Sequence, residues 1–187
     1  MDMSHSTETA VFGGGCFWCT EAVFKSLKGV ASVIPGYTGG SLKDPTYDQV
    51  ATGKTGHAEA VKIEFDPAVI SYEDLLTVFF NTHDPTSLNK QGADVGTDYR
   101  SAIFFASPAQ EETARLVIQE LGGAGAYDKP IVTEVVPLGE FFAAEDYHRD
   151  YYDLHRGDPY CELVIAPKME KMQERFATLL KDASHRL

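Results

Sequence analysis

The sequence has little cysteine, an excess of acidic over basic residues and no long apolar stretch. Three cysteines in 187 residues are too few, and an odd number, for a disulfide scaffold. The 16 basic and 28 acidic side chains give a net charge of −12, which argues against nucleic-acid binding, because such proteins normally carry a basic face. No run of about 18 apolar residues occurs, so we expect no transmembrane helix and no membrane partner.

The remaining composition is that of a globular protein, with 43% hydrophobic and 24% charged residues. Residues 1–8 lack a basic start and an apolar run, so we expect a flexible tail rather than a secretory signal. Residues 9–187 are expected to form a single domain in the cytoplasm. Thiols are mostly reduced there, so any disulfide is more often catalytic than structural.

The hydrophobic pattern switches repeatedly between the period of a strand and that of a helix. It predicts strands over residues 9–12, 30–35, 61–66, 101–106 and 131–137. It predicts helices over residues 17–28, from the cap Ser71 to Asn81, from the cap Ser107 to 122–123, and onward from Pro167. The last helix carries Met169, Met172, Phe176 and Leu179 on one stripe, which is typical of core packing.

The order of these elements favours an α+β fold over a doubly wound parallel sheet, because there is no regular βαβ spacing. We expect a mixed or antiparallel sheet packed by helices in two layers, with a ferredoxin-like core and long ordered loops. The loops at 36–56 and 83–98 are rich in Gly, Tyr, Asp and Thr. Loops of this length are usually functional, although an inert surface loop remains an alternative.

The most informative segment is Gly13-Gly14-Gly15-Cys16, which leads from a predicted strand into a predicted helix. Free backbone N–H groups at a helix N-terminus favour an anion, so we expect Cys16 to have a lowered pKa and to act as a nucleophile. The glycines do not form a dinucleotide fingerprint, because Trp18 stands where the last glycine belongs. No Lys-Ser/Thr pair follows, so this is not a phosphate loop.

The Cys16-x-x-Cys19 spacing is compatible with three kinds of site. A zinc site is disfavoured because there is no second cysteine pair and no ligand spacing among His57, His83 and His148. A thioredoxin-type dithiol has this spacing but lacks the expected βαβ frame. A nucleophilic cysteine with an apolar pocket explains Phe17 and Trp18 best, although both rings fit a protein core equally well.

The third cysteine, Cys161, lies in a turn-rich stretch between two helical segments. A cysteine on such a loop can move to another thiol and resolve an oxidised sulfur. The alternative is a small buried residue at the start of a strand-like segment over 161–165.

Eight segments of the chain resemble the peptide methionine sulfoxide reductase A family, in the family's order and over nearly all of the chain after residue 9. They are GGCFW at 14–18, GYTGG at 36–40, PTY at 45–47, TGHAE at 55–59, HDPT at 83–86, DVGTDYRS at 94–101, AEDYH at 144–148 and IAPK at 165–168.

The resemblance implies an enzyme without metal or cofactor that reduces the S epimer of methionine sulfoxide, free or in proteins. Cys16 corresponds to the nucleophile, Glu59 to the acid, and Tyr47 and Tyr99 to the paired phenols. Removal of an oxide needs protons, and a partly buried Glu59 would have the raised pKa that a proton donor near neutral pH requires. The histidines of the matched segments are expected to order loops through hydrogen bonds.

The resemblance also assigns the substrate pocket to Phe17 and Trp18, which hold the methyl group, and to Asp94, which orients the substrate. Oxidised Cys16 is a sulfenic acid, which condenses with a second thiol. We expect that thiol to be Cys161, the family's usual recycling cysteine.

Cys19 is an alternative resolving residue, at a position where many members have glycine. The two-residue gap along a helix disfavours Cys19, because the Cβ atoms lie awkwardly for a disulfide.

The resemblance also implies that thioredoxin reduces the disulfide of the oxidised enzyme. We expect the protein to be a monomer. Two other functions remain open: a general CxxC thiol–disulfide oxidoreductase, and a non-catalytic module that binds methionine through Phe17 and Trp18.

Overall fold

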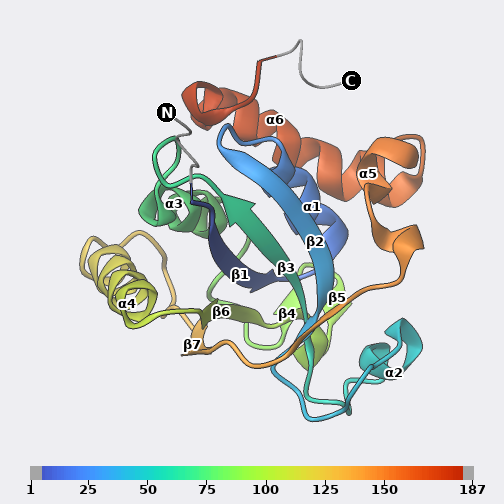
Figure 1. Cartoon of the computed structure of the whole chain (residues 1–187). Coiled ribbons are helices and arrows are strands. Elements are labelled where there is room, and N and C mark those ends of the chain that lie inside the picture. The colour runs from blue at the N-terminus through green and yellow to red at the C-terminus, as the bar shows by residue number, and fades with distance from the viewer. Residues whose placement is uncertain (1–5, 183–187) are drawn as a thin grey trace.

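A computed structural model describes residues 6–182, and a six-stranded mixed sheet forms its centre (Figure 1). The strand order is β7-β6-β1-β3-β2-β8, and all neighbours are antiparallel except β6 and β7. The strands are β1 (Glu8–Gly14), β2 (Val30–Thr38), β3 (Ala58–Phe65), β6 (Ser101–Phe105), β7 (Glu134–Pro137) and β8 (Phe141–Ala143). The expected α+β class with a mixed sheet is therefore confirmed.

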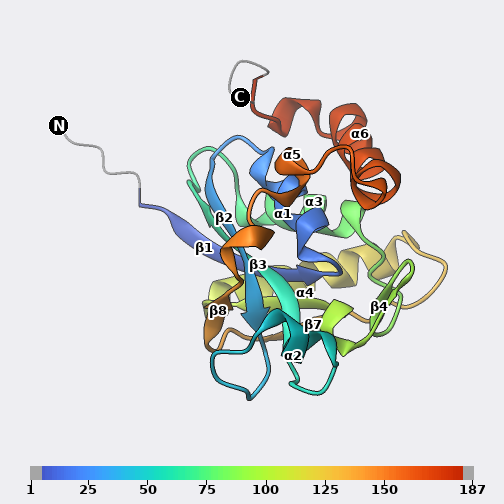
Figure 2. The same ribbon diagram turned by 90° about the vertical axis from the view of Figure 1, so that its right-hand side faces the viewer.

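Helices pack on one face of the sheet, and an irregular segment crosses the other (Figures 1 and 2). Alternate residues of β1 point to opposite faces, so Phe12 stacks on Phe79 of the helical layer while Val11 faces Leu138 and Phe141. The helices are α1 (Phe17–Lys25), α2 (Tyr47–Ala51), α3 (Tyr72–Thr82), α4 (Pro108–Gly123), α5 (Tyr151–Leu154) and α6 (Ala166–Arg175).

Local signals in the sequence fix the starts of α3 and α4. Ser71 and Asp74 form a reciprocal capping box at the start of α3, and the Ser107 hydroxyl accepts from the backbone of Gln110 at the start of α4. Met172 on α6 is fully buried, so the predicted core stripe is confirmed at this residue. The first helix is shorter than expected and ends at Lys25.

The strand-like segment predicted over 161–165 is wrong: Cys161–Ile165 forms a π-helical turn that runs directly into α6. Cys161 and Ile165 are buried while the residues between them are not fully buried, and this spacing of four suits a helix. The exposed Leu163 belongs to this turn.

The two long loops contain short ordered elements. The first holds α2, whose N-cap Thr46 forms a capping box with Gln49. The second holds the small hairpin of β4 (Lys90–Gln91) and β5 (Asp94–Val95), followed by the 3-10 turn η1 (Thr97–Tyr99). Another 3-10 turn, η2 (Asp146–His148), precedes α5, and a last one, η4 (Ala177–Leu179), follows α6.

Residues 1–5 of the expected N-terminal tail lie outside the described residues, and β1 begins at Glu8. Within residues 6–182, no helix is both long enough and apolar enough to span a bilayer.

Candidate active site

Cys16 is the N-cap residue of α1, as the sequence predicts. Gly15 precedes it with a φ of +93°, and a Cβ atom there would lie 2.7 Å from the Gln91 side chain. The Cys16 carbonyl accepts the backbone N–H groups of Cys19 and Thr20 at 3.2 and 3.4 Å. The tight glycine turn therefore places a partly exposed thiol at the start of a helix beside β4.

The expected lowering of the Cys16 pKa is wrong. Burial, the Cys19 thiol and the charge of Glu59 raise the pKa of Cys16 well above its ordinary value. The hydrogen bond from Cys16 lowers the pKa of Cys19 to about 7, with further help from the charge of Lys168.

Glu59 lies on the interior strand β3 and is only 2% exposed. Its Oε2 atom accepts the backbone N–H of Phe17 at 3.0 Å. Burial, with the neighbouring charges of Asp98 and Asp94, raises the pKa of Glu59 to about 8. The prediction of a buried acid with a raised pKa is confirmed, and Glu59 holds a proton at neutral pH.

The fold brings Tyr47 and Tyr99 to this acid from two different loops. Tyr47 is the first residue of α2, Tyr99 is the last residue of η1, and both are partly buried. Burial and the charge of Glu59 raise the pKa of Tyr47 to about 12 and that of Tyr99 still further. Both phenols therefore keep their protons and remain hydrogen-bond donors.

All three cysteines belong to one apolar cluster around Ile165, and all are free thiols. Cys19 and Cys161 are buried, with 3% and 0% of their surfaces exposed. Burial raises the pKa of Cys161. The Tyr160 hydroxyl lies 3.7 Å from the Cys19 sulfur and donates to Oδ2 of Asp94 at 3.0 Å, so Asp94 reaches the cysteines through Tyr160.

The two aromatic residues after Cys16 lie in different environments. Phe17 is a core residue, 1% exposed, with its ring centroid 5.8 Å from that of Tyr37 and 5.0 Å from that of His148. Trp18 is only partly buried, stacks on Tyr151 at 3.6 Å and donates its indole N–H to Nδ1 of His148 at 3.0 Å. Of the pair, Trp18 has the surface available for an apolar ligand.

Two carboxylates near this centre were missed by the sequence analysis. Asp98 is 2% exposed, and its Oδ2 atom has no hydrogen-bond partner among the described residues. Glu145 accepts the Tyr37 hydroxyl at 3.0 Å and the backbone N–H of Tyr47 at 3.1 Å, so it ties α2 to the end of β2. Both lie in the matched segments DVGTDYRS and AEDYH, which were the available signal.

His57 orders a loop through hydrogen bonds, as expected. Nδ1 of His57 accepts the Gly40 N–H at 3.1 Å, and its Nε2 lies 2.7 Å from the Leu42 carbonyl. Nε2 of His83 lies 2.7 Å from the Ser101 hydroxyl. Within the described part of the chain, no group of three or more His, Cys, Asp or Glu side chains is arranged to hold a metal ion.

A cysteine at a helix start, a protonated buried acid beside it and further thiols in the same cluster define a thiol-dependent oxidoreductase. Comparison with known proteins identifies the kind: the family model of peptide methionine sulfoxide reductase matches residues 8–180, and the chain belongs to this family. It is an enzyme that reduces methionine sulfoxide through its cysteines. A non-catalytic methionine-binding module is therefore excluded.

Relatives of similar length support this assignment. The peptide methionine sulfoxide reductase MsrA of Deinococcus radiodurans is 53% identical over 174 residues, 93% of this chain and 84% of that protein. MsrA of Thermus thermophilus is 54% identical over 174 residues, 93% of this chain and 98% of that protein. The reduced form of Mxr1 from Saccharomyces cerevisiae has a TM-score of 0.78 and 32% identity, covering 84% of this chain and 91% of that one.

Proposed function

We propose that Cys16 is the nucleophile and Glu59 the proton donor in reduction of the S epimer of methionine sulfoxide, free or in proteins. The observation that carries this assignment is a buried, protonated Glu59 hydrogen-bonded to the first residue of the Cys16 helix. The Cys16 sulfur attacks the sulfoxide sulfur while Glu59 protonates the sulfoxide oxygen. The net step converts thiol and sulfoxide into sulfenic acid and sulfide, so the oxygen moves to Cys16.

Tyr47 and Tyr99 are proposed to donate hydrogen bonds to the sulfoxide oxygen, since the charge of Glu59 acts on both phenols and both stay protonated. Trp18 is proposed to hold the methyl group on sulfur. Phe17 would support it from the core, a smaller role than the sequence analysis assigns. Asp94 is proposed to orient the substrate together with Tyr160, to which it is hydrogen-bonded.

For the second step we propose a disulfide between Cys16 and Cys161, with release of water from the sulfenic acid. The shared cluster of the three thiols supports this pairing. Cys19 is the second candidate, because it contacts Cys16 and has a pKa lowered to about 7.

Thioredoxin is the proposed reductant of this disulfide. Mxr1 has been solved in complex with Trx2, but that structure is 24% identical with a TM-score of 0.56, so it supports the fold alone. A general CxxC oxidoreductase would need Cys19 but not Glu59, which separates it from the proposed enzyme.

We further propose a monomeric cytoplasmic enzyme with one catalytic domain over residues 9–187 and a ferredoxin-like core. The chain order β1-α1-β2-β3-α3-β6, with sheet order β6-β1-β3-β2, supports that description of the core. Free thiols at all three cysteines suit a reducing compartment.

A single-turnover assay tests the proposal. Reduced protein is mixed with the separated epimers of a methionine sulfoxide peptide, without and with thioredoxin, using wild type and the Cys16→Ser, Cys19→Ser and Cys161→Ser variants. We expect one sulfide per enzyme from the S epimer, none from Cys16→Ser, and a disulfide that mass mapping assigns to Cys16 and Cys161. Activity in Cys16→Ser, or reduction of the R epimer alone, would contradict the proposal.

A further inference from the structure

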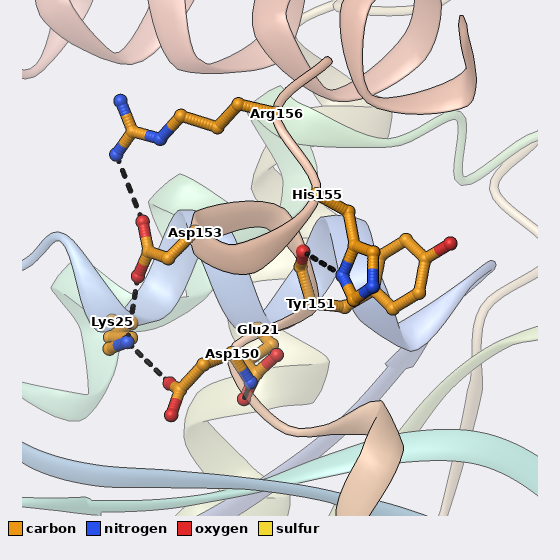
Figure 3. Close-up of polar contacts among 7 residues, drawn as sticks. All are labelled: Glu21, Lys25, Asp150, Tyr151, Asp153, His155 and Arg156. Carbon is orange, nitrogen blue, oxygen red and sulfur yellow. Dashed lines mark hydrogen bonds and ion pairs between the residues drawn. The ribbon is translucent and has the colours of Figure 1, made fainter. Parts of the chain in front are cut away.

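Three side chains of α1 lie on one face of the helix: Trp18, Glu21 and Lys25, at spacings of three and four. Trp18 belongs to the candidate pocket. Glu21 and Lys25 both contact the short helix α5, which has no role in the proposed mechanism (Figure 3).

The side chain of Glu21 binds the backbone at the start of α5. Its side chain is 2% exposed, and Oε1 accepts the backbone N–H of Asp150 at 3.0 Å. The backbone N–H of Tyr151 faces the same carboxyl group. Asp150 is a non-glycine residue with a φ of +54°, and its own side chain does not cap α5. The carboxylate of Glu21 therefore takes the place of a local cap.

Lys25 adds a second attachment, one turn further along α1. Its ammonium group pairs with Asp150 and, at 2.8 Å, with Asp153, which also pairs with Arg156 at 2.9 Å (Figure 3). These side chains are about half exposed, so each ion pair contributes little alone. The buried bond of Glu21 is the main attachment.

The attachment fixes one aromatic ring in particular. Tyr151 is the first residue of α5, and its ring lies parallel to Trp18, with centroids 3.6 Å apart and planes 4° apart. Its hydroxyl donates to Asp158 at 3.0 Å, and its other neighbour is the stacked ring of His155, with centroids 4.1 Å apart. Helix α1 thus contacts the start of α5 at two points: Trp18 stacks on the Tyr151 ring, and Glu21 accepts from the backbone of Asp150.

We propose that Glu21, assisted by Lys25, is a positioning residue that holds the Tyr151 ring against Trp18 and thereby sets the wall of the sulfoxide pocket. This inference rests on the proposed role of Trp18. Glu21 does not touch Cys16 or Glu59 in the described structure, so its loss affects substrate binding rather than the chemical step.

The attachment is sensitive to pH. Burial raises the pKa of Glu21 to about 7, and a neutral carboxyl group is a weaker acceptor for the N–H groups of α5. The charged groups around it are Lys25 on α1 and a set from the segments packed against it: Asp150, Asp153, Arg156 and Lys181. The Tyr151 ring is therefore held less firmly as the pH falls through neutrality.

Intrinsic fluorescence tests the inference directly, because Trp18 is the only tryptophan in the chain. We expect Glu21→Ala to shift the Trp18 emission to longer wavelength and increase its quenching by acrylamide. The KM for a methionine S-sulfoxide peptide, with dithiothreitol as reductant, should rise about 5- to 20-fold while kcat stays within about twofold. The matched control is Asp74→Ala, which removes the carboxylate that caps α3 and should leave emission and KM unchanged.

A double-mutant cycle separates positioning from general loosening. Tyr151→Leu should produce the same emission shift as Glu21→Ala, and the double variant should add nothing further. Lys25→Met should give a smaller shift in the same direction, and it keeps the inference testable if Glu21→Ala fails to fold. Additive effects, or wild-type emission and KM in Glu21→Ala, would overturn the inference.

The pH arm uses Glu21→Gln, which keeps the acceptor oxygen but does not titrate. His148 and Cys19 are titratable groups that also lie close to Trp18. The Glu21→Gln variant therefore shows whether Glu21 is the group that causes the pH dependence of the emission. We expect wild-type emission to change with a midpoint near neutrality and this change to disappear in Glu21→Gln. An unchanged midpoint would contradict the assignment to Glu21. The emission measurements need no substrate, so their outcome is independent of whether the sulfoxide assay supports the proposed function.

Discussion

The backbone N–H of Phe17 and Oε2 of Glu59 lie 3.0 Å apart, and this bond joins the acid on β3 to the first turn of the Cys16 helix. It fixes the acid relative to the nucleophile through the backbone N–H of residue 17, so a change of side chain at that residue does not remove the bond. Because Glu59 is buried, the bond stabilises a carboxyl group that still keeps its proton at neutral pH. The buried surroundings of Glu59 thus set both the position and the protonation of its carboxyl group.

Glu59→Gln should lower the single-turnover rate of sulfoxide reduction by about 10²- to 10⁴-fold, the usual contribution of a general acid. The amide keeps the shape and the acceptor oxygen for Phe17, so the KM should change little. The measurement is rapid quench of reduced enzyme with the sulfoxide peptide. Glu64→Gln, on the same strand but away from Cys16, is the control. A loss of less than threefold in Glu59→Gln would rule out its role as the acid.

Glu59 should also make the fold less stable at alkaline pH. Its folded-state pKa is about 8 and its ordinary value 4.5, so the folded protein binds the extra proton between these values. The stability that protonated Glu59 contributes is therefore fully present below about pH 4.5 and is lost as the pH rises through about 8. Relative to Glu59→Gln, the free energy of unfolding of wild type should fall by about 2–4 kcal/mol between pH 5 and 9. Urea denaturation of both proteins over this range measures it, and parallel curves would contradict the pKa.

The sequence predicts the placement of Cys16 because it depends on local signals: a strand, a glycine turn and a helix start. The charge state of Cys16 was not predictable in this way. Its pKa depends on burial and on Glu59 and Cys19, and neither the burial nor the contact with Glu59, 43 positions further along the chain, follows from local sequence.

The same distinction explains the other differences. The capping residues Ser71 and Ser107 act within one turn and were predicted correctly. The π-helical turn that begins at Cys161 differs from the predicted strand, because a run of only five mostly apolar residues fits either structure. Asp98 was missed because its importance lies in burial beside Glu59, which only the packing of η1 on β3 creates.

Asp98→Asn should shift the pH dependence of the reaction. Apart from burial itself, the Asp98 charge is the first contribution that raises the pKa of Glu59. Removing it lowers that pKa, so Glu59 ionises earlier and activity is lost at a lower pH. We expect the alkaline limb of the kcat profile to move down by about 0.5–1 pH unit, with kcat near pH 6 within about threefold of wild type. Asp128→Asn, at an exposed position in the loop after α4, should leave the profile unchanged.

Gly36→Ala should both destabilise the protein and reduce activity, although Gly36 touches no reacting group. A Cβ atom at Gly36 would lie 2.4 Å from the Phe142 carbonyl oxygen, so β2 and β8 could not keep their pairing. Displacing β8 moves the following Glu145, whose carboxylate holds Tyr47 in place. We expect a loss of about 1–3 kcal/mol in the free energy of unfolding, and a lower single-turnover rate in the variant that remains folded.

The matched control is Gly139→Ala, in the crossing segment between β7 and β8, because a Cβ there meets no atom within 4 Å. Urea denaturation and the sulfoxide assay on both variants give the comparison. If Gly36→Ala lost stability but kept the wild-type rate, β8 would have no part in placing Tyr47. If both variants lost activity equally, the effect would come from the crossing segment as a whole and not from the close approach of the two strands at Gly36.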